Sequence, residues 1–134
     1  MIAIDSSVLI DLLGEDRMAD AAEATLREAL GRGRVAVCDV VVAEVCSSFG
    51  NGGEVIQVIE DMGVTYIPVA QQAAVRAGEM QKKYRERGGR RERSVPDFIV
   101  GAHAMLQCAG LITRDDGFFR DYFKGLKIIV PKAA

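Results

Sequence analysis

The fold is decided by residues 1–14, MIAIDSSVLIDLLG. The short apolar run Ile2–Ile4 predicts a β-strand. Asp5 follows that strand directly, and Ser6 or Ser7 can cap the helix expected next. Leucines and a valine at helical spacing then continue to a glycine, which predicts the end of this helix. A strand that runs straight into a helix is typical of α/β proteins with a parallel sheet.

The same alternation of strand and helix continues along the rest of the chain. Short β-branched runs predict four more strands, at Val35–Cys38, Val64–Ile67, Leu111–Thr113 and Lys127–Val130. Helical spacing predicts further helices at Met18–Leu30, Val40–Ser48 (capped by Asp39), Glu54–Met62, Ala70–Arg87 and Asp97–Ala109. We therefore expect one α/β domain over residues 1–134, with a mostly parallel central sheet of about five strands and helices on both faces.

Composition excludes several classes of protein. The 134 residues are 49% hydrophobic and 27% charged, which argues against disordered and collagen-like chains. Three widely spaced cysteines without a Cys-x-x-Cys pair fit neither a zinc site nor a disulfide framework, and they suggest a reducing compartment. The sequence shows no signal-peptide pattern and no apolar run long enough for a membrane span. We expect a soluble, cytoplasmic protein that does not enter membranes.

Acidic residues stand where predicted strands end or helices begin. Asp5 follows the first strand, and Asp115 and Asp116 follow the fourth. Asp97 opens a predicted helix, and Glu44 lies within the otherwise apolar run VVVAEV. In parallel α/β sheets, ligands bind at the carboxyl ends of the strands. These acids are therefore candidates for one shared site.

Each acid also has a simpler structural explanation. Asp97 places a favourable negative charge at a helix N-terminus, and Asp5 could cap the following helix. The acids after the fourth strand suit a turn before Gly117. We interpret Asp11 as part of a solvated helix face. Glu44 is harder to explain in this way, because a carboxylate among valines needs a partner or a metal.

Four carboxylates at one edge of a sheet would repel each other, and a divalent cation would relieve that repulsion. Oxygen ligands without nearby His or Cys favour Mg²⁺ or Mn²⁺ over zinc. Such a site can activate water and neutralise charge on a phosphodiester. The acids therefore predict hydrolysis of phosphodiester bonds.

Four segments carry a resemblance to a known family: residues 4–10 (IDSSVLI), Glu44, residues 96–104 (PDFIVGAHA) and residues 111–115 (LITRD). In order and spacing they resemble the motifs of PIN-domain ribonucleases, and most closely those of VapC toxins from prokaryotic toxin–antitoxin pairs. The resemblance spans the chain from residue 2 to about residue 130.

The resemblance implies a PIN fold, an endoribonuclease that needs Mg²⁺ or Mn²⁺, a homodimer, and a cognate antitoxin that silences it. Matched position by position, the catalytic and metal-binding acids are Asp5, Glu44, Asp97 and Asp115. Ser6 and Thr113 match polar positions that support these acids by hydrogen bonds. Because Asp116 stands next to Asp115, either of the two residues could be the fourth acid. Ser7 stands where many relatives carry Asn.

Residues 82–93 form a basic segment with a net charge of +5, whereas the rest of the chain carries −7. The segment suggests an RNA-binding arm leading into Asp97, with phosphate contacts from Lys82, Lys83, Arg85, Arg90, Arg91 and Arg93. A solvated helix end and loop explains it equally well. The total charge of −2 therefore does not exclude an RNA partner.

Two other functions compete with a ribonuclease. A non-catalytic PIN-like module could bind RNA or a protein, although it would have no need for a repulsive cluster of acids. A phosphotransfer domain could use Asp5 as its phosphoacceptor, but it would need paired acids after the first strand, where Ser6 and Ser7 stand. The aromatic residues after the fourth strand suggest core packing or part of a dimer or antitoxin surface: Phe118, Phe119, Tyr122 and Phe123.

Overall fold

The computed structural model describes residues 1–89 and 93–132. Its strands are β1 (Ile2–Ile4), β2 (Val35–Val37), β3 (Thr65–Tyr66), β4 (Gly110–Ile112) and β5 (Lys127–Ile129). Its helices are α1 (Ser6–Leu13), α2 (Ala19–Arg32), α3 (Asp39–Ser48), α4 (Gly52–Asp61), α5 (Gln71–Glu86), α6 (Val95–Gln107) and α7 (Asp116–Tyr122). All five predicted strands are present, each within about two residues of its expected ends.

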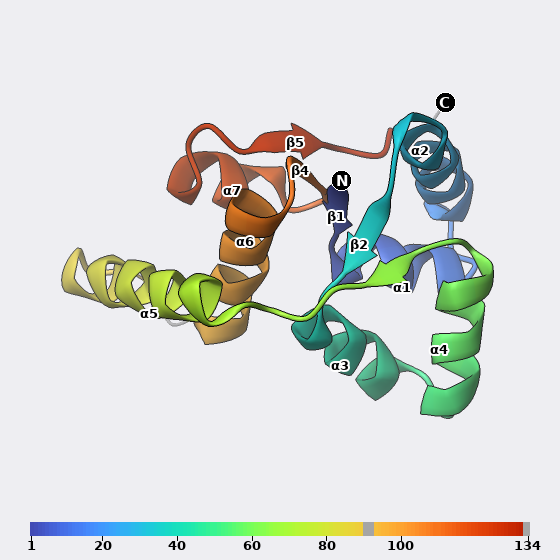
Figure 1. The fold of residues 1–134 in the computed structure, drawn as a ribbon, viewed down its shortest axis with the longest axis horizontal. Helices are drawn as coiled ribbons and strands as arrows, with labels where there is room; N and C mark the ends of the chain where they lie inside the picture. Colours follow the sequence, from blue (N-terminus) through green and yellow to red (C-terminus); the bar gives the residue numbers. More distant parts are fainter. Residues whose placement is uncertain (90–92, 133–134) are drawn as a thin grey trace.

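The five strands form one sheet in the order β3-β2-β1-β4-β5, and every pairing is parallel. The predicted α/β architecture is therefore confirmed. Figure 1 shows α6 and α7 on one side of the strands and α1 and α2 on the other. From β1 the chain builds the sheet outward through β2 and β3, then crosses over to β4 and β5 on the other side of β1. This reversal between β1 and β4 is the switch point at which such sheets bind ligands.

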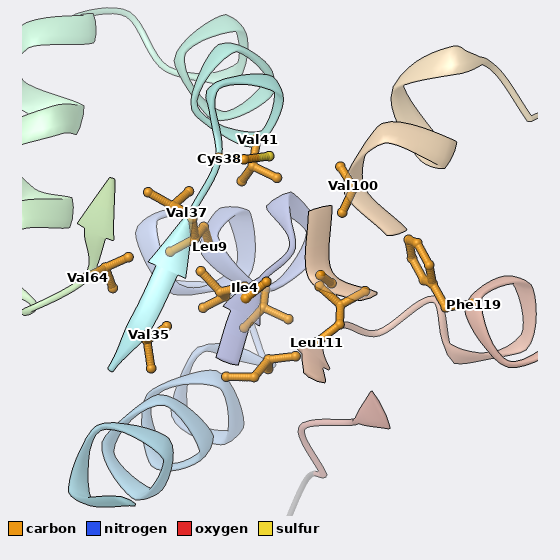
Figure 2. Close-up of a cluster of buried hydrophobic side chains, with 14 of the residues drawn as sticks. Ile4, Leu9, Val35, Val37, Cys38, Val41, Val64, Val100, Leu111 and Phe119 are labelled. Carbon is orange, nitrogen blue, oxygen red and sulfur yellow. The ribbon is translucent and has the colours of Figure 1, made fainter. Parts of the chain in front are cut away.

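The core lies on both faces of the central strands, as Figure 2 shows. Ile4, Val35 and Leu111 from the strands are almost completely buried. Leu9 from α1 and Val41 from α3 pack against them. Full burial of one such side chain stabilises the fold by about 1.5–3 kcal/mol, which holds the carboxyl ends of β1 and β4 in fixed positions.

Two predicted helix caps were wrong, and one helix was not predicted. The N-cap of α1 is Asp5, as the alternative explanation of that acid expected, and not Ser6 or Ser7, because the Asp5 carboxylate accepts the Ser6 N–H at 2.8 Å. The N-cap of α3 is Cys38, and Asp39 is the first residue of that helix. The segment after β4 forms the additional helix α7, which is not predictable from hydrophobic spacing.

The three cysteines are free thiols, as expected, and Cys38 is buried. No helix in the described part of the chain is both long enough and apolar enough to span a membrane.

Candidate active site

Asp5 lies at the switch point of the sheet, directly after β1. Its side chain is only 8% exposed. Oδ1 accepts the Ser6 N–H at 2.8 Å, and Oδ2 accepts the hydroxyls of Ser7 at 3.1 Å and Thr113 at 2.7 Å. The backbone N–H of Asp5 donates to the carbonyl of Ile112 in β4 at 2.9 Å, which fixes the junction of the two strands. Three donors therefore orient this carboxylate and support its ionised form.

Thr113 links Asp5 to a second acid. It follows β4 and is fully buried. Its hydroxyl donates to Asp5 and accepts the backbone N–H of Asp115 at 3.0 Å. One hydroxyl thus ties together the two strand ends that carry Asp5 and Asp115.

Asp115 is paired with Arg93, which precedes α6. The Arg93 guanidinium makes a bidentate contact with the carboxylate, and its Nη2 donates to Oδ1 at 3.0 Å. The guanidinium also lies 4.4 Å from the centroid of the Phe118 ring. Cation–π stacking and a two-point ion pair hold Arg93 against the acids, where its charge offsets their repulsion.

Glu44 and Asp97 approach Asp5 from two helices. Glu44 lies on α3 and is half-buried, and Asp97 lies in the first turn of α6. The Asp97 carboxylate accepts the backbone N–H of Ser94 at 3.0 Å, so it helps to cap its own helix. This agrees with the structural explanation of Asp97 as a favourable charge at a helix N-terminus.

The acids influence one another's ionisation. Burial raises the pKa of Asp5 above its ordinary value, hydrogen bonds from Thr113, Ser6 and Ser7 lower it, and the charge of Asp115 raises it. Burial also raises the pKa of Glu44, and the charges of Asp5 and Asp97 raise it further, while a hydrogen bond from the Ser6 side chain opposes the shift. The structure therefore brings Asp5, Glu44, Asp97 and Asp115 into one electrostatic cluster, which we call the acidic quartet.

The donor chemistry of the quartet fits a hard divalent cation, since all four side chains offer carboxylate oxygens. Within residues 1–89 and 93–132, no three His, Cys, Asp or Glu side chains are gathered closely enough to hold one ion. The four acids thus share an electrostatic environment without converging on a single point.

Asp116 lies outside the quartet. It is the first residue of α7, and its carboxylate pairs with Arg120 one turn later at 3.4 Å. Of the two neighbouring acids, Asp115 therefore lies near Asp5, whereas Asp116 forms an ion pair within α7.

Asp11 is a further residue whose surroundings were wrongly predicted. It is 2% exposed rather than solvated. Its carboxylate accepts from Nη2 of Arg114 at 3.0 Å, and the Arg114 backbone N–H donates to the Ser7 hydroxyl at 3.3 Å. Because Arg114 stands between Thr113 and Asp115, the ion pair between Arg114 and Asp11 holds the loop after β4 against α1. Sequence reasoning missed the pair, although a charged residue beside the acidic motif was visible at position 114.

The residues of the predicted basic segment lie in different structural surroundings. Lys82, Lys83 and Arg85 are exposed on the last turns of α5, which is a regular helix up to Glu86. Arg93 is instead held by Asp115. Two further predicted RNA contacts, Arg90 and Arg91, lie outside the described residues.

Comparisons with known proteins place this geometry in a family. The model of the PIN domain family matches residues 2–124. No curated protein matches the chain. Among solved structures, VapBC2 from Rickettsia felis, bound to a DNA fragment from its promoter, is similar with a TM-score of 0.76 and 16% identity over 98% of this chain and 100% of that chain.

Two other solved structures have a similar fold. A toxin–antitoxin complex from Klebsiella pneumoniae gives a TM-score of 0.66 at 22% identity, covering 100% of both chains. VapC20 from Mycobacterium tuberculosis, a toxin that cleaves the Sarcin-Ricin loop, gives 0.66 at 17% identity over 95% of this chain and 99% of that chain. The family match covers most of the chain, and these structures share its architecture. The chain therefore belongs to the PIN domain family, with the fold of VapC-like toxins.

Proposed function

We propose that the protein is an endoribonuclease that hydrolyses RNA phosphodiester bonds and depends on Mg²⁺ or Mn²⁺. The observation that carries this proposal is the acidic quartet at the switch point between β1 and β4. Burial raises the pKa of Asp5 and of Glu44, and the charges of neighbouring acids raise it further, so keeping this site ionised has an energetic cost. Such a cost is explained if the site works with a bound cation, which favours the ionised acids.

Each side chain has a distinct task in the proposed reaction. Ser6, Ser7 and Thr113 hold Asp5 in one orientation through their donated hydrogen bonds. Glu44 adds a half-buried carboxylate from α3 to the same site. Asp5, Glu44, Asp97 and Asp115 are the residues that would hold a cation, and they would have to draw closer together to do so, because no three such side chains of the described residues are gathered around one point. The bound cation would polarise the scissile phosphate and activate the attacking water.

We further propose that the protein is the toxin of a type II toxin–antitoxin pair. The fold shared with VapBC2 and with the toxin–antitoxin complex from Klebsiella pneumoniae supports a protein antitoxin as its partner. Ribonuclease activity is supported by the fold shared with VapC20. A homodimer and a cytoplasmic location stay predictions from the family resemblance.

An RNA cleavage assay tests the proposed function. The purified protein is incubated with structured RNAs in Mn²⁺, in Mg²⁺ or in EDTA, beside an Asp97→Asn variant. The Asn side chain can still accept the Ser94 N–H, so the start of α6 is preserved. We expect cleavage only with metal and a loss of at least about a hundredfold in the variant.

Two outcomes would contradict the proposal. Cleavage that persists in both EDTA and the Asp97→Asn variant would remove the quartet from the mechanism. Metal-independent RNA binding by the wild-type protein without any cleavage would instead favour a non-catalytic binding module.

A further inference from the structure

A groove separate from the acidic quartet is formed by α5, α6 and α7. Its volume is about 420 Å³. Helix α5 supplies one face of residues at helical spacing, α6 supplies Met105, and the segment of α7 and beyond supplies the opposite wall. Figure 1 shows α5 beside α6, with α7 next to α6. The lining residues are Arg76, Met80, Lys83, Tyr84, Arg87, Met105, Asp121, Tyr122 and Lys124.

The groove is strongly basic. It carries four cations (Arg76, Lys83, Arg87 and Lys124) against the single acid Asp121, whereas the whole chain has a net charge of −2. All four cations are exposed, and none forms a salt bridge within the described residues. Their charge is therefore available to an external anion.

The floor of the groove is apolar and partly accessible. Met80, Met105 and Tyr122 are each half-buried. The Tyr122 ring is braced at an angle of 78° against the ring of Tyr84, with centroids 5.2 Å apart. A basic rim around an aromatic and thioether floor combines the two features that bind single-stranded nucleic acids, namely phosphate contacts and surfaces for bases.

The groove is linked to Asp115 of the acidic quartet through two intervening side chains, Phe118 and Arg93. Tyr122 packs on Phe118 with ring centroids 5.4 Å apart, and Arg93 stacks on the same Phe118 ring while it pairs with Asp115. A strand bound in the groove would thus lie on the other side of one aromatic cluster from the acids.

We propose that this groove binds the phosphate backbone of single-stranded RNA, on the other side of the Phe118–Tyr122 contact from the acidic quartet. The proposal rests on the proposed ribonuclease function and assigns to that function a binding surface. A second copy of the chain is a poorer occupant. A two-fold contact through this face would bury the four cations of each copy against a surface whose lining offers the single acid Asp121.

Binding of a fluorescent 20-nucleotide oligouridylate in EDTA tests the proposal. Fluorescence anisotropy is measured from 50 to 200 mM NaCl, and a gel checks that the RNA is intact. The test variant is Lys83→Gln/Arg87→Gln/Lys124→Gln. The control, Arg17→Gln/Arg34→Gln/Lys127→Gln, removes the same charge from residues that do not line the groove. Thermal unfolding verifies that both variants fold.

We expect the groove variant to bind RNA at least about tenfold more weakly at 50 mM NaCl, with a salt slope shallower by about 2, because each lost phosphate contact removes about 0.7 from the slope for single strands. The control should bind RNA within about twofold of the wild type. In the cleavage assay, the groove variant should show a raised KM with an unchanged kcat.

Equal loss in both variants, or no loss in either, would overturn the proposal. Polyglutamate that competes as strongly as the RNA would assign the groove to an acidic peptide. A dimer that dissociates only in the groove variant would assign it to a second copy. The proposed nuclease function fails separately: a wild-type protein that binds RNA through the groove but never cleaves any would contradict the function and leave the groove assignment intact.

Discussion

At the scale of single residues, the Thr113 hydroxyl is the most informative group. It donates to Asp5 at 2.7 Å and accepts the N–H of Asp115 at 3.0 Å, with no exposure to solvent. It also lowers the pKa of Asp5 against the effect of burial. A buried hydroxyl that serves two acids should therefore control both the ionisation and the position of the site.

The substitution Thr113→Val removes this hydroxyl and nearly preserves the volume of the side chain. The pKa of Asp5, already raised, should rise further, so the acid limb of the pH–activity profile should move to higher pH. Stability at pH 7 should fall by about 1–3 kcal/mol, because the buried partners lose a hydrogen bond. The part of this loss due to ionised Asp5 is complete above the further raised pKa of the variant and disappears below the raised pKa of the wild type, where Asp5 is protonated in both folded proteins.

The two effects can be measured by pH profiles of kcat/KM and by urea unfolding at pH 7 and pH 4. Thr113→Ser keeps the hydroxyl and should retain the wild-type acid limb. If Thr113→Val and Thr113→Ser give the same acid limb, the hydroxyl has no role in the ionisation of Asp5.

Single residues were predictable from sequence only in part. Position relative to a strand end was enough to select Asp5, and the apolar setting of Glu44 singled out that residue. The partner of each charge was not predictable, because it comes from distant sequence. Asp11 was assigned to solvent because its partner Arg114 stands 103 residues away, and the pairing of Arg93 with Asp115 spans 22 residues.

At the scale of elements, helix α6 carries one edge of the site and packs very closely on the segment after α7. Gly101 lies in the middle of α6, and a Cβ built there would come within 2.3 Å of the Phe123 ring. Phe123 is almost fully buried, so its ring has little space to move. The absence of a side chain at position 101 therefore allows α6 to approach the aromatic cluster.

We expect Gly101→Ala to destabilise the protein by about 1–3 kcal/mol, since overpacking outweighs the better helix propensity of alanine. Gly78→Ala in α5 is the matched control, because no atom lies within 4 Å of its added Cβ. That change should stabilise the protein by about 0.5–1 kcal/mol. Urea unfolding of both variants measures the difference, and a neutral or stabilising Gly101→Ala would show that the contact between α6 and Phe123 is looser than described.

Elements were predicted well where hydrophobic spacing was regular and poorly where it was not. The strands and the first six helices follow clear periodic patterns and turn residues. Helix α7 has only seven residues, includes Gly117 and is dense in aromatic side chains. Its helical form is set by packing of Phe118 and Phe119 into the core rather than by local spacing, so the sequence alone did not reveal it.

At the scale of the whole molecule, the order of the strands creates the site. The chain places β1 between β2 and β4, so Asp5 meets residues that follow β4 from more than 100 positions away. The parallel sheet followed from the sequence pattern, and so did the placing of Asp5 and Asp115 after neighbouring strands. How closely the acids converge depends on side-chain packing across four elements, which no local pattern specifies.

The central claim is that the acidic quartet binds a divalent cation as one unit. Calorimetric titration of Mn²⁺ into the protein at pH 7 tests it most directly, with Asp97→Asn as the test variant and Asp20→Asn, an exposed acid on α2, as the control. We predict saturable binding to the wild type and to Asp20→Asn, weakened at least about tenfold in Asp97→Asn. No saturable binding to the wild type, or equal binding to Asp97→Asn, would contradict the claim.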